Sequence, residues 1–284
     1  MSKSYLIIGA NGQLGTALRN QYPEARFADS DELDITDAAS VQTFDWDGIE
    51  VILNAAAYTN VDGAETPEGR VASWQVNAEA VKNLCRVARQ RDIMLVHISS
   101  DYVFDGTKSP HLEDEPLSPL SVYGASKAAG DLLVQQLDRH YLLRTTWVIG
   151  EGKNFVRTMF GLAEKGISPT VVSDQVGRLT FTSELVRAVD HLLTTGADFG
   201  AYNVTNSGES ASWADITRTI FTLSGRDDLL VTDTSTADYF AGKQGIAPRP
   251  LQSEMSLDKL QSTGFSSRDW KDDLKDYIQK EMTT

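Results

Sequence analysis

The sequence predicts an α/β protein in which a doubly wound parallel sheet is followed by a smaller C-terminal lobe. In the first half, short apolar runs alternate with segments of helical spacing, and a glycine-rich turn joins the first run to the first helix. The apolar runs are near-continuous, which is typical of parallel strands covered on both faces. Strand–helix alternation of this kind is the pattern of a Rossmann-type, doubly wound sheet.

The predicted elements follow in order along the chain. Strands are expected at Tyr5–Ile8, Arg26–Ala28, Val51–Ala57, Ile93–Ile98 and Tyr141–Thr146. Helical spacing is found over Leu14–Gln21, Ala38–Phe44, Ala72–Arg91 and Ala125–Leu137. After Trp147 the pattern loosens, with helices expected over Thr182–Thr194, Ser212–Leu223 and Arg268–Met282 and short strands at Thr170–Val172, Ala201–Thr205 and Leu229–Thr232.

Charge and composition exclude several classes of protein. The chain has 284 residues, with 26 basic and 40 acidic side chains and a formal charge of −14. This charge argues against binding to nucleic acid or to an anionic membrane, and no apolar run approaches the ~18 residues of a membrane-spanning helix. Because Met1–Gly9 already has a strand pattern, we expect no signal peptide. The single cysteine, Cys85, cannot form an intrachain disulfide, which favours a cytoplasmic protein.

A glycine-rich loop carries the first functional signal. The first strand runs into Gly9-Ala10-Asn11-Gly12-Gln13-Leu14-Gly15, with the spacing G-x-x-G-x-x-G. Such glycines let the chain turn tightly and let its backbone approach a pyrophosphate at the positive end of the next helix. An ordinary strand–helix turn is the alternative, but the position after the first strand favours a dinucleotide site. We therefore predict a dinucleotide-binding domain over residues 1–147 and a substrate-binding lobe over residues 148–284, with some segments returning to the first domain.

A second anchor for a dinucleotide lies at the end of the second strand. Asp29 follows Arg26–Ala28, where a carboxylate can accept hydrogen bonds from an adenosine ribose. The next three residues are Ser30, Asp31 and Glu32, without an arginine to neutralise a 2′-phosphate. The pattern therefore favours NADH over NADPH. The alternative is that Asp29 and Asp31 are plain loop carboxylates, because acidic residues are common in turns.

A tyrosine and a lysine four residues apart carry the candidate chemistry. Tyr123 and Lys127 would lie one above the other on a helix face. A nearby cation lowers the pKa of a phenol, which otherwise titrates at about 10. The strand Ile93–Ile98 is followed by Ser99 and Ser100, so the Ser100 hydroxyl could meet Tyr123 at the ligand-binding edge of the sheet. The same Tyr–Lys spacing recurs by accident at Tyr239 and Lys243, where this context is missing.

The glycine loop, Ser100, Tyr123 and Lys127 together resemble the extended short-chain dehydrogenase/reductase superfamily. Further runs resemble the dTDP-4-dehydrorhamnose reductases within it, over nearly the whole chain. These runs are Leu33-Asp34-Ile35-Thr36-Asp37, Asn54-Ala55-Ala56-Ala57-Tyr58-Thr59, Ser100-Asp101-Tyr102-Val103-Phe104-Asp105-Gly106, Arg144-Thr145-Thr146-Trp147-Val148, Asp174-Gln175-x-Gly177 and Arg249-Pro250.

The resemblance implies reduction of the C4 ketone of dTDP-4-dehydro-β-L-rhamnose to dTDP-β-L-rhamnose with NADPH or NADH. It implies that Tyr123 protonates the ketone oxygen, that Lys127 binds the nicotinamide ribose and lowers the Tyr123 pKa, and that Ser100 holds the sugar oxygen. The motifs and the resemblance together predict that the cofactor is bound by Gly9, Gly12, Gln13, Leu14, Gly15, Asp29, Asp34, Ile35, Ala57, Tyr58, Thr59, Tyr123 and Lys127. Those implied on the substrate side are Val61, Ser100, Asp101, Tyr102, Trp147, Asn154, Gln175 and Arg249.

No metal site is predicted. Some relatives hold a magnesium ion at a dimer contact with a Glu in the first helix, where this chain has Ala17. The four histidines are scattered without the paired spacing of ligands. Ala17 therefore also argues against that dimer contact. The partners that we expect are a nucleotide-sugar substrate and a second copy of the chain in a homodimer, and neither a nucleic acid nor a membrane.

Several alternatives remain open. Tyr58 and Trp147 could simply pack the core, and Asp101 could cap a turn. A nucleotide-sugar epimerase or dehydratase would share the fold and the Tyr–Lys pair. Dehydratases of this superfamily tend to have Asp-Glu after the hydroxyl residue, whereas Ser100 is followed by Asp101-Tyr102. A non-catalytic, cofactor-binding regulatory subunit is the second rival, although Ser100, Tyr123 and Lys127 are all present.

Overall fold

The computed structural model describes residues 4–283 and contains a central sheet of six parallel strands. The strand order is β10-β5-β4-β3-β1-β2, so the chain reverses its direction of winding between β1 and β3. This confirms the doubly wound, Rossmann-type sheet that the sequence predicts. The strands are β1 (Tyr5–Ile8), β2 (Arg26–Ala28), β3 (Val51–Asn54), β4 (Met94–Ser100), β5 (His140–Thr145) and β10 (Gly200–Asn203).

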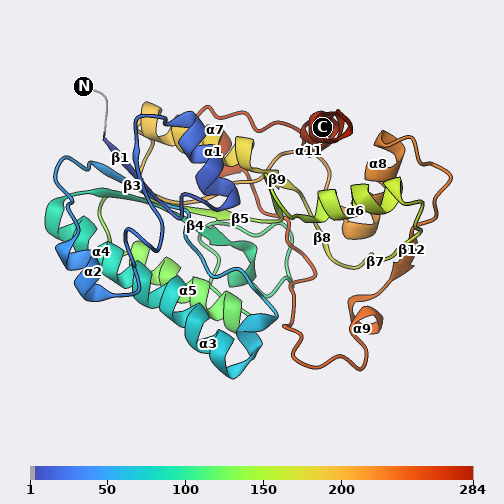
Figure 1. Ribbon diagram of the computed structural model, residues 1–284, viewed down its shortest axis with the longest axis horizontal. Coiled ribbons are helices and arrows are strands. Elements are labelled where there is room, and N and C mark those ends of the chain that lie inside the picture. Colours follow the sequence, from blue (N-terminus) through green and yellow to red (C-terminus); the bar gives the residue numbers. More distant parts are fainter. Residues whose placement is uncertain (1–3, 284) are drawn as a thin grey trace.

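Helices cover both faces of this sheet (Figure 1). Helices α1 (Gln13–Gln21) and α7 (Thr182–Thr195) pack on one face. On the other face lie α2 (Ala38–Thr43), α4 (Ala80–Arg91) and α5 (Val122–Val134). Alternate strand residues enter the two cores, as in β4, where Leu95 points to one core and Val96 to the other. Burial of both faces explains the continuous apolar runs of the inner strands β1, β3 and β4, whereas two of the three residues of the edge strand β2 are exposed.

The predicted helix Ala72–Arg91 is longer and less regular in the structure. It begins as α3 (Pro67–Trp74), passes through a π-helical turn at Gln75–Glu79 and continues as α4. Thr66 caps the start by accepting a hydrogen bond from the Gly69 amide, and Pro67 occupies the first turn. In the π-helical turn, Asn77 bonds both backbone groups of Tyr58 and the Ser126 hydroxyl. The irregular turn therefore connects the loop after β3 to α5.

The second half contributes a smaller helical lobe. Its core lies between α6 (Phe155–Glu164), α8 (Trp213–Leu223) and α11 (Trp270–Met282), and Trp270, Leu274 and Ile278 of α11 are buried as the sequence predicts. Helix α6 was not predicted, and the expected strand Leu229–Thr232 is shifted to Thr232–Thr234. The remaining elements are β6 (Val148–Ile149), β7 (Thr170–Val172), β8 (Val176–Gly177), β9 (Thr180–Phe181), β11 (Ala211–Ser212), β12 (Thr232–Thr234), α9 (Thr236–Tyr239) and α10 (Asp258–Ser262).

Two segments from the second half of the chain belong to the central sheet and its helical layer. Strand β10 pairs in parallel with β5 as the sixth strand, and α7 packs beside α1. The division at residue 147 stays a prediction, since the central sheet takes strands from both sides of it. Within residues 4–283 there is no helix with the length and apolar character to cross a membrane.

Candidate active site

The glycine loop lies where the sheet changes its direction of winding. Gly9 has φ +75°, and a Cβ there would lie 2.6 Å from the Ala56 nitrogen, so the turn requires glycine. A Cβ on Gly15 would lie 2.1 Å from the Gly9 oxygen. A Cβ on Gly12 would meet only that oxygen, at 3.4 Å, and Gly12 begins α1 without a side-chain cap. Gly9 and Gly15 thus shape the loop, while Gly12 leaves an open helix N-terminus of the kind that binds phosphate groups.

Two cavities meet at Gly12. The first, of about 320 Å³, is lined on the expected adenine side by Gly9, Asp29, Ser30, Asp34 and Ile35. The second, of about 460 Å³, extends to the end of β4 and to α5. Gly12 and Ala57 line both, so the two cavities adjoin at the glycine loop. The second cavity gathers Gln13, Leu14, Thr59, Val61, Ser100, Asp101, Tyr102, Tyr123, Lys127 and Trp147. Gly15 and Tyr58 line neither cavity.

The tyrosine and the lysine project from α5 into the larger cavity. Ser121 caps α5 by accepting a hydrogen bond from the Gly124 amide. A Cβ on Gly124 would lie 2.2 Å from the Tyr102 carbonyl oxygen, so glycine permits the helix to approach the end of β4. The rings of Tyr102 and Tyr123 are 5.4 Å apart and nearly perpendicular. Lys127 donates a hydrogen bond from Nζ to the Ile98 carbonyl at 2.6 Å, which fixes its ammonium group beside the strand.

Burial dominates the electrostatics of these groups. It raises the pKa of Tyr123, which a hydrogen bond with Ser100 partly counters. Burial lowers the pKa of Lys127 to about 8, against the attraction of Asp131. Asp101 accepts a hydrogen bond from the Ser100 hydroxyl at 2.8 Å, and burial raises the pKa of its carboxyl. At neutral pH the site therefore holds a protonated phenol close to an ammonium group, which is the state needed to donate a proton.

A third cavity, of about 290 Å³, lies in the second lobe and is lined by aromatic side chains. Trp213 lines it and stacks on Trp147, with ring centroids 3.8 Å apart. Trp147 has φ +47°, a strained conformation for this residue that tends to occur at functional sites. The predicted residues Gln175 and Arg249 also line this cavity. Arg249 binds both carboxylate oxygens of Asp62 at 2.9 Å, which holds its guanidinium group in place.

The geometry can be compared with known proteins. The sequence profile described as the RmlD substrate binding domain matches residues 3–283. The chain belongs to this family. It is 36% identical to a dTDP-4-dehydrorhamnose reductase of Aggregatibacter actinomycetemcomitans, over 95% of this chain and 96% of that one. It is 38% identical to a dTDP-4-keto-6-deoxy-D-glucose reductase of Streptomyces niveus, over 95% and 94%.

A solved structure extends the comparison. The dTDP-4-dehydrorhamnose reductase of Bacillus anthracis, in complex with NADP, superposes with a TM-score of 0.88 at 33% identity. The alignment covers 99% of each chain. Family membership and this superposition confirm both the resemblance found in the sequence and the fold class.

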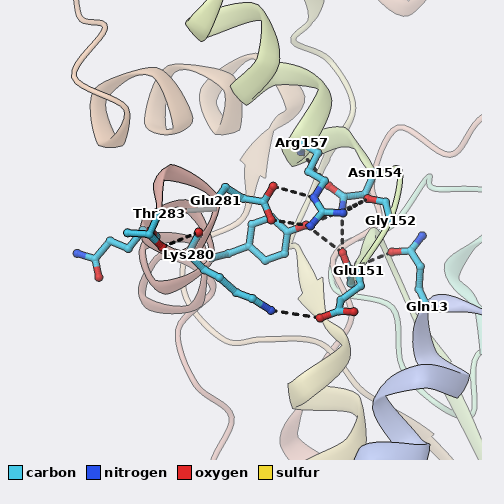
Figure 2. A network of polar contacts seen from close by, with 11 residues as sticks. Gln13, Glu151, Gly152, Asn154, Arg157, Lys280, Glu281 and Thr283 are labelled. Carbon is cyan, nitrogen blue, oxygen red and sulfur yellow. Dashed lines mark hydrogen bonds and ion pairs between the residues drawn. The ribbon is translucent and has the colours of Figure 1, made fainter.

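One predicted substrate residue of this RmlD-family chain lies elsewhere. Asn154 lines neither the catalytic cavity nor the aromatic one, and its side chain is occupied by internal bonds (Figure 2). Its Oδ1 caps α6 by accepting from the Arg157 amide at 2.9 Å. Its Nδ2 donates to the Gly150 carbonyl and to the Tyr277 hydroxyl, each at 2.8 Å. The structure thus gives Asn154 a capping and bridging role, and its binding to substrate stays a prediction.

The same network reaches the glycine loop. Gln13 accepts a hydrogen bond from the Gly150 amide at 2.9 Å. Arg157 forms a bidentate ion pair with Glu281 of α11, in which Nε and Nη2 donate to the two carboxylate oxygens (Figure 2). The loop after β6 is therefore held between the predicted pyrophosphate site and the C-terminal helix. Because these contacts join residues that are 137 and 124 positions apart, sequence reasoning had no local signal for them.

Sequence reasoning also missed several residues that shape the RmlD-family site. Trp213 stacks on Trp147, and Asp62 forms an ion pair with Arg249. The sequence indicates neither of these two contacts. Asp131 could have been found, since it lies four residues after Lys127 on the same helix face. Residues 4–283 contain no group of three or more His, Cys, Asp or Glu side chains arranged to hold a metal ion.

Proposed function

We propose that the chain is an NAD(P)H-dependent oxidoreductase that reduces the C4 ketone of dTDP-4-dehydro-β-L-rhamnose to dTDP-β-L-rhamnose, in dTDP-rhamnose biosynthesis. The observation that carries the proposal is the meeting of Ser100, Tyr123 and Lys127 in one cavity with Gly12 of the open glycine loop. Membership of the RmlD family and the similarity to a dTDP-4-dehydrorhamnose reductase support the substrate. The NADP complex of the Bacillus anthracis enzyme supports the cofactor.

The residues of the cavity fit a dinucleotide. The missing side chain of Gly12 leaves room for a pyrophosphate, with Gln13 and Leu14 beside it, and Asp29 and Ile35 line the adenine side. When bound, the nicotinamide supplies the hydride that adds to C4 of the sugar. Tyr123 donates its phenolic proton to the C4 oxygen as that oxygen gains negative charge. The ketone thus gains one hydride and one proton to become an alcohol.

The neighbours of Tyr123 prepare this proton transfer. The Ser100 hydroxyl donates to Asp101 Oδ1 and lies within hydrogen-bonding reach of the phenol, so it can turn from Asp101 to hold the substrate oxygen. Lys127 lies one turn along α5, where its ammonium charge stabilises the phenolate left after transfer. Tyr102, packed against Tyr123, limits the positions that a sugar ring can take. Together these groups orient the ketone and supply one proton for each turnover.

We assign the nucleotide end of the substrate to the aromatic cavity. Trp147 lines the catalytic cavity and stacks on Trp213, which lines the aromatic one, so a single extended ligand can pass from one to the other. Gln175 offers an amide there, and Arg249 offers guanidinium donors that suit a diphosphate. These assignments and the cofactor residues named above remain proposals.

The direct test is to measure cofactor oxidation with the dTDP-4-keto sugar and to identify the product. We expect reduction at C4 and no elimination of water. An epimerised or dehydrated sugar would favour the sister class, and cofactor binding without turnover would favour a regulatory subunit. The name of the Streptomyces niveus relative makes dTDP-4-keto-6-deoxy-D-glucose the second substrate to test.

The same assay compares the two cofactors. The cavity on the adenine side is lined by Asp29 and Asp34 and, among the described residues, by neither lysine nor arginine. A 2′-phosphate would therefore meet like charge, and we expect NADH to be used at least comparably to NADPH. A kcat/KM more than ~30-fold higher with NADPH would contradict this expectation, since that ratio is roughly 2 kcal/mol of discrimination. A cytoplasmic location, favoured by the single Cys85, and a homodimer also remain proposals.

A further inference from the structure

A buried carboxylate lies directly behind the catalytic helix face. Tyr123, Lys127 and Asp131 follow one another at intervals of four residues on α5, so they share one side of the helix. That side packs on the sheet, and the side chain of Asp131 is fully buried. Lys127 is also buried, with 1% of its surface exposed. Two ionisable side chains one helical turn apart, both withdrawn from water, interact far more strongly than a surface pair does.

A cation from the sheet holds this carboxylate. Arg144 of β5 donates from Nε to Asp131 Oδ2 at 2.9 Å. The arginine is itself fixed, because its Nη1 donates to the Glu113 carbonyl at 2.8 Å and its guanidinium group lies over the Phe104 ring. Asp131 is thus paired with Arg144, and Lys127 lies one helical turn before it on the same face of α5. Burial raises the pKa of the Asp131 carboxyl, and the attraction of Arg144 and of Lys127 counters this. Of these three side chains only Lys127 reaches the catalytic cavity.

Few other charges face Lys127. From β4, His97 is buried, and burial together with Lys127 lowers its pKa well below the usual value, so it is neutral. From the turn after β4, Asp101 and Tyr102 are buried beside Tyr123, and burial raises the pKa of each. The packed residues Ser73 and Asn77 are uncharged. Glu65 bonds the Val122 amide at the first residue of the helix.

We propose that Asp131 is a positioning residue for Lys127: its buried carboxylate is the counterion that keeps the Lys127 ammonium group charged beside the cavity, and Arg144 holds that carboxylate in place. The inference rests on the proposed function, in which Lys127 must be cationic to stabilise the Tyr123 phenolate. Removing the carboxylate charge favours the neutral amine, so Lys127 would lose its proton at a lower pH.

The experiment titrates Lys127 itself in the intact protein. Competitive acetylation at a series of pH values, followed by mass spectrometry of the Lys127 peptide, gives its titration midpoint without any substrate. We expect Asp131→Asn to move this midpoint down by about one pH unit or more. The high-pH limb of kcat/KM should move by a similar amount. The labelling result stands even if the proposed substrate is not turned over, so the two proposals can fail separately.

The matched control is Arg144→Gln, which breaks the same buried ion pair from its other side and leaves the carboxylate. It should destabilise the fold as Asp131→Asn does, but it should not lower the Lys127 midpoint. If Asp131→Asn fails to fold, the double variant Asp131→Asn/Arg144→Gln removes both charges and leaves no unpaired buried ion. An unchanged midpoint in the aspartate variants, or an equal downward shift in Arg144→Gln, would overturn the proposal.

Discussion

The indole rings of Trp147 and Trp213 stack with their centroids 3.8 Å apart and their planes 22° apart. Trp147 follows β5 at the catalytic cavity, whereas Trp213 begins α8 in the second lobe. The stack therefore joins the two halves of the proposed substrate site. The stack also stabilises Trp147 in its left-handed backbone conformation, which is strained for any residue other than glycine.

We predict that Trp213→Leu weakens substrate binding more than it slows the chemical step. A stacked aromatic pair contributes ~0.5–1.5 kcal/mol, so the KM for the nucleotide sugar should rise roughly 3- to 10-fold. Steady-state kinetics at saturating cofactor measures both parameters. Trp74→Leu is the control, because Trp74 is 41% exposed on α3 and lines none of the three cavities described above. A KM that is unchanged in Trp213→Leu would contradict the substrate path.

Tyr123→Phe removes the proposed proton donor and little else. We expect kcat to fall by ~10²-fold or more, which is the usual effect of losing a general acid. The dissociation constant of NADPH, measured by fluorescence, should remain close to that of the wild type. Tyr5→Phe, a change in a ring packed on Tyr22 at the first strand, should keep full activity. Near-normal turnover in Tyr123→Phe would exclude this tyrosine as the acid.

The glycine loop offers a test that separates folding from binding. Gly12→Ala adds a methyl group that the fold can accept, but that group points to where the pyrophosphate is proposed to lie. Cofactor affinity should fall by about 10-fold or more with little change in Tm. Gly15→Ala places its methyl group against the Gly9 oxygen, so its Tm should fall clearly. Calorimetry of both apoproteins and titration with NADH distinguish the two effects, and equal Tm losses would contradict this division of roles.

The buried Lys127 makes a pH-dependent contribution to stability. Burial lowers its pKa from 10.5 to about 8, so between these values the unfolded chain holds more protons than the folded one. Stability from this group therefore rises with pH over that window. We expect the wild type to gain free energy of unfolding relative to Lys127→Met as the pH increases from 8 to 10. Denaturation of both proteins at several pH values tests the sign, and a difference independent of pH would refute it.

The parts of the site that depend on local sequence could be predicted. The glycine spacing, the interval from Tyr123 to Lys127 and the serine after β4 are short-range patterns with a direct chemical meaning, and the fold brings all three to one edge of the sheet. The inner strands β1, β3, β4 and β5 were predicted with bounds within three residues of those observed, because continuous apolar runs depend on burial on both faces.

The parts that depend on distant contacts could not be predicted. Nothing near Arg249 in the sequence indicates that Asp62 binds it, and nothing near Asn154 indicates that Tyr277 occupies its amide. Asn154 was expected to bind substrate, yet an asparagine before Phe155–Glu164 is also a helix cap. Had that second interpretation been applied, α6 would have been predicted as well, because Val156, Met159, Phe160 and Ala163 have helical spacing.

The sixth strand has a consequence for how this chain can be divided. β10 lies at the edge of the central sheet and covers β5, although about 55 residues separate the two strands in the sequence. A fragment that ends at residue 147 would keep the pairing of β5 with β4 but leave the other edge of β5 unpaired, and such edges recruit strands from other molecules. A transplantable cofactor module would therefore need residues 182–203 as a separate insert. Exchanges of the substrate lobe between relatives should keep that insert with the sheet rather than with the lobe.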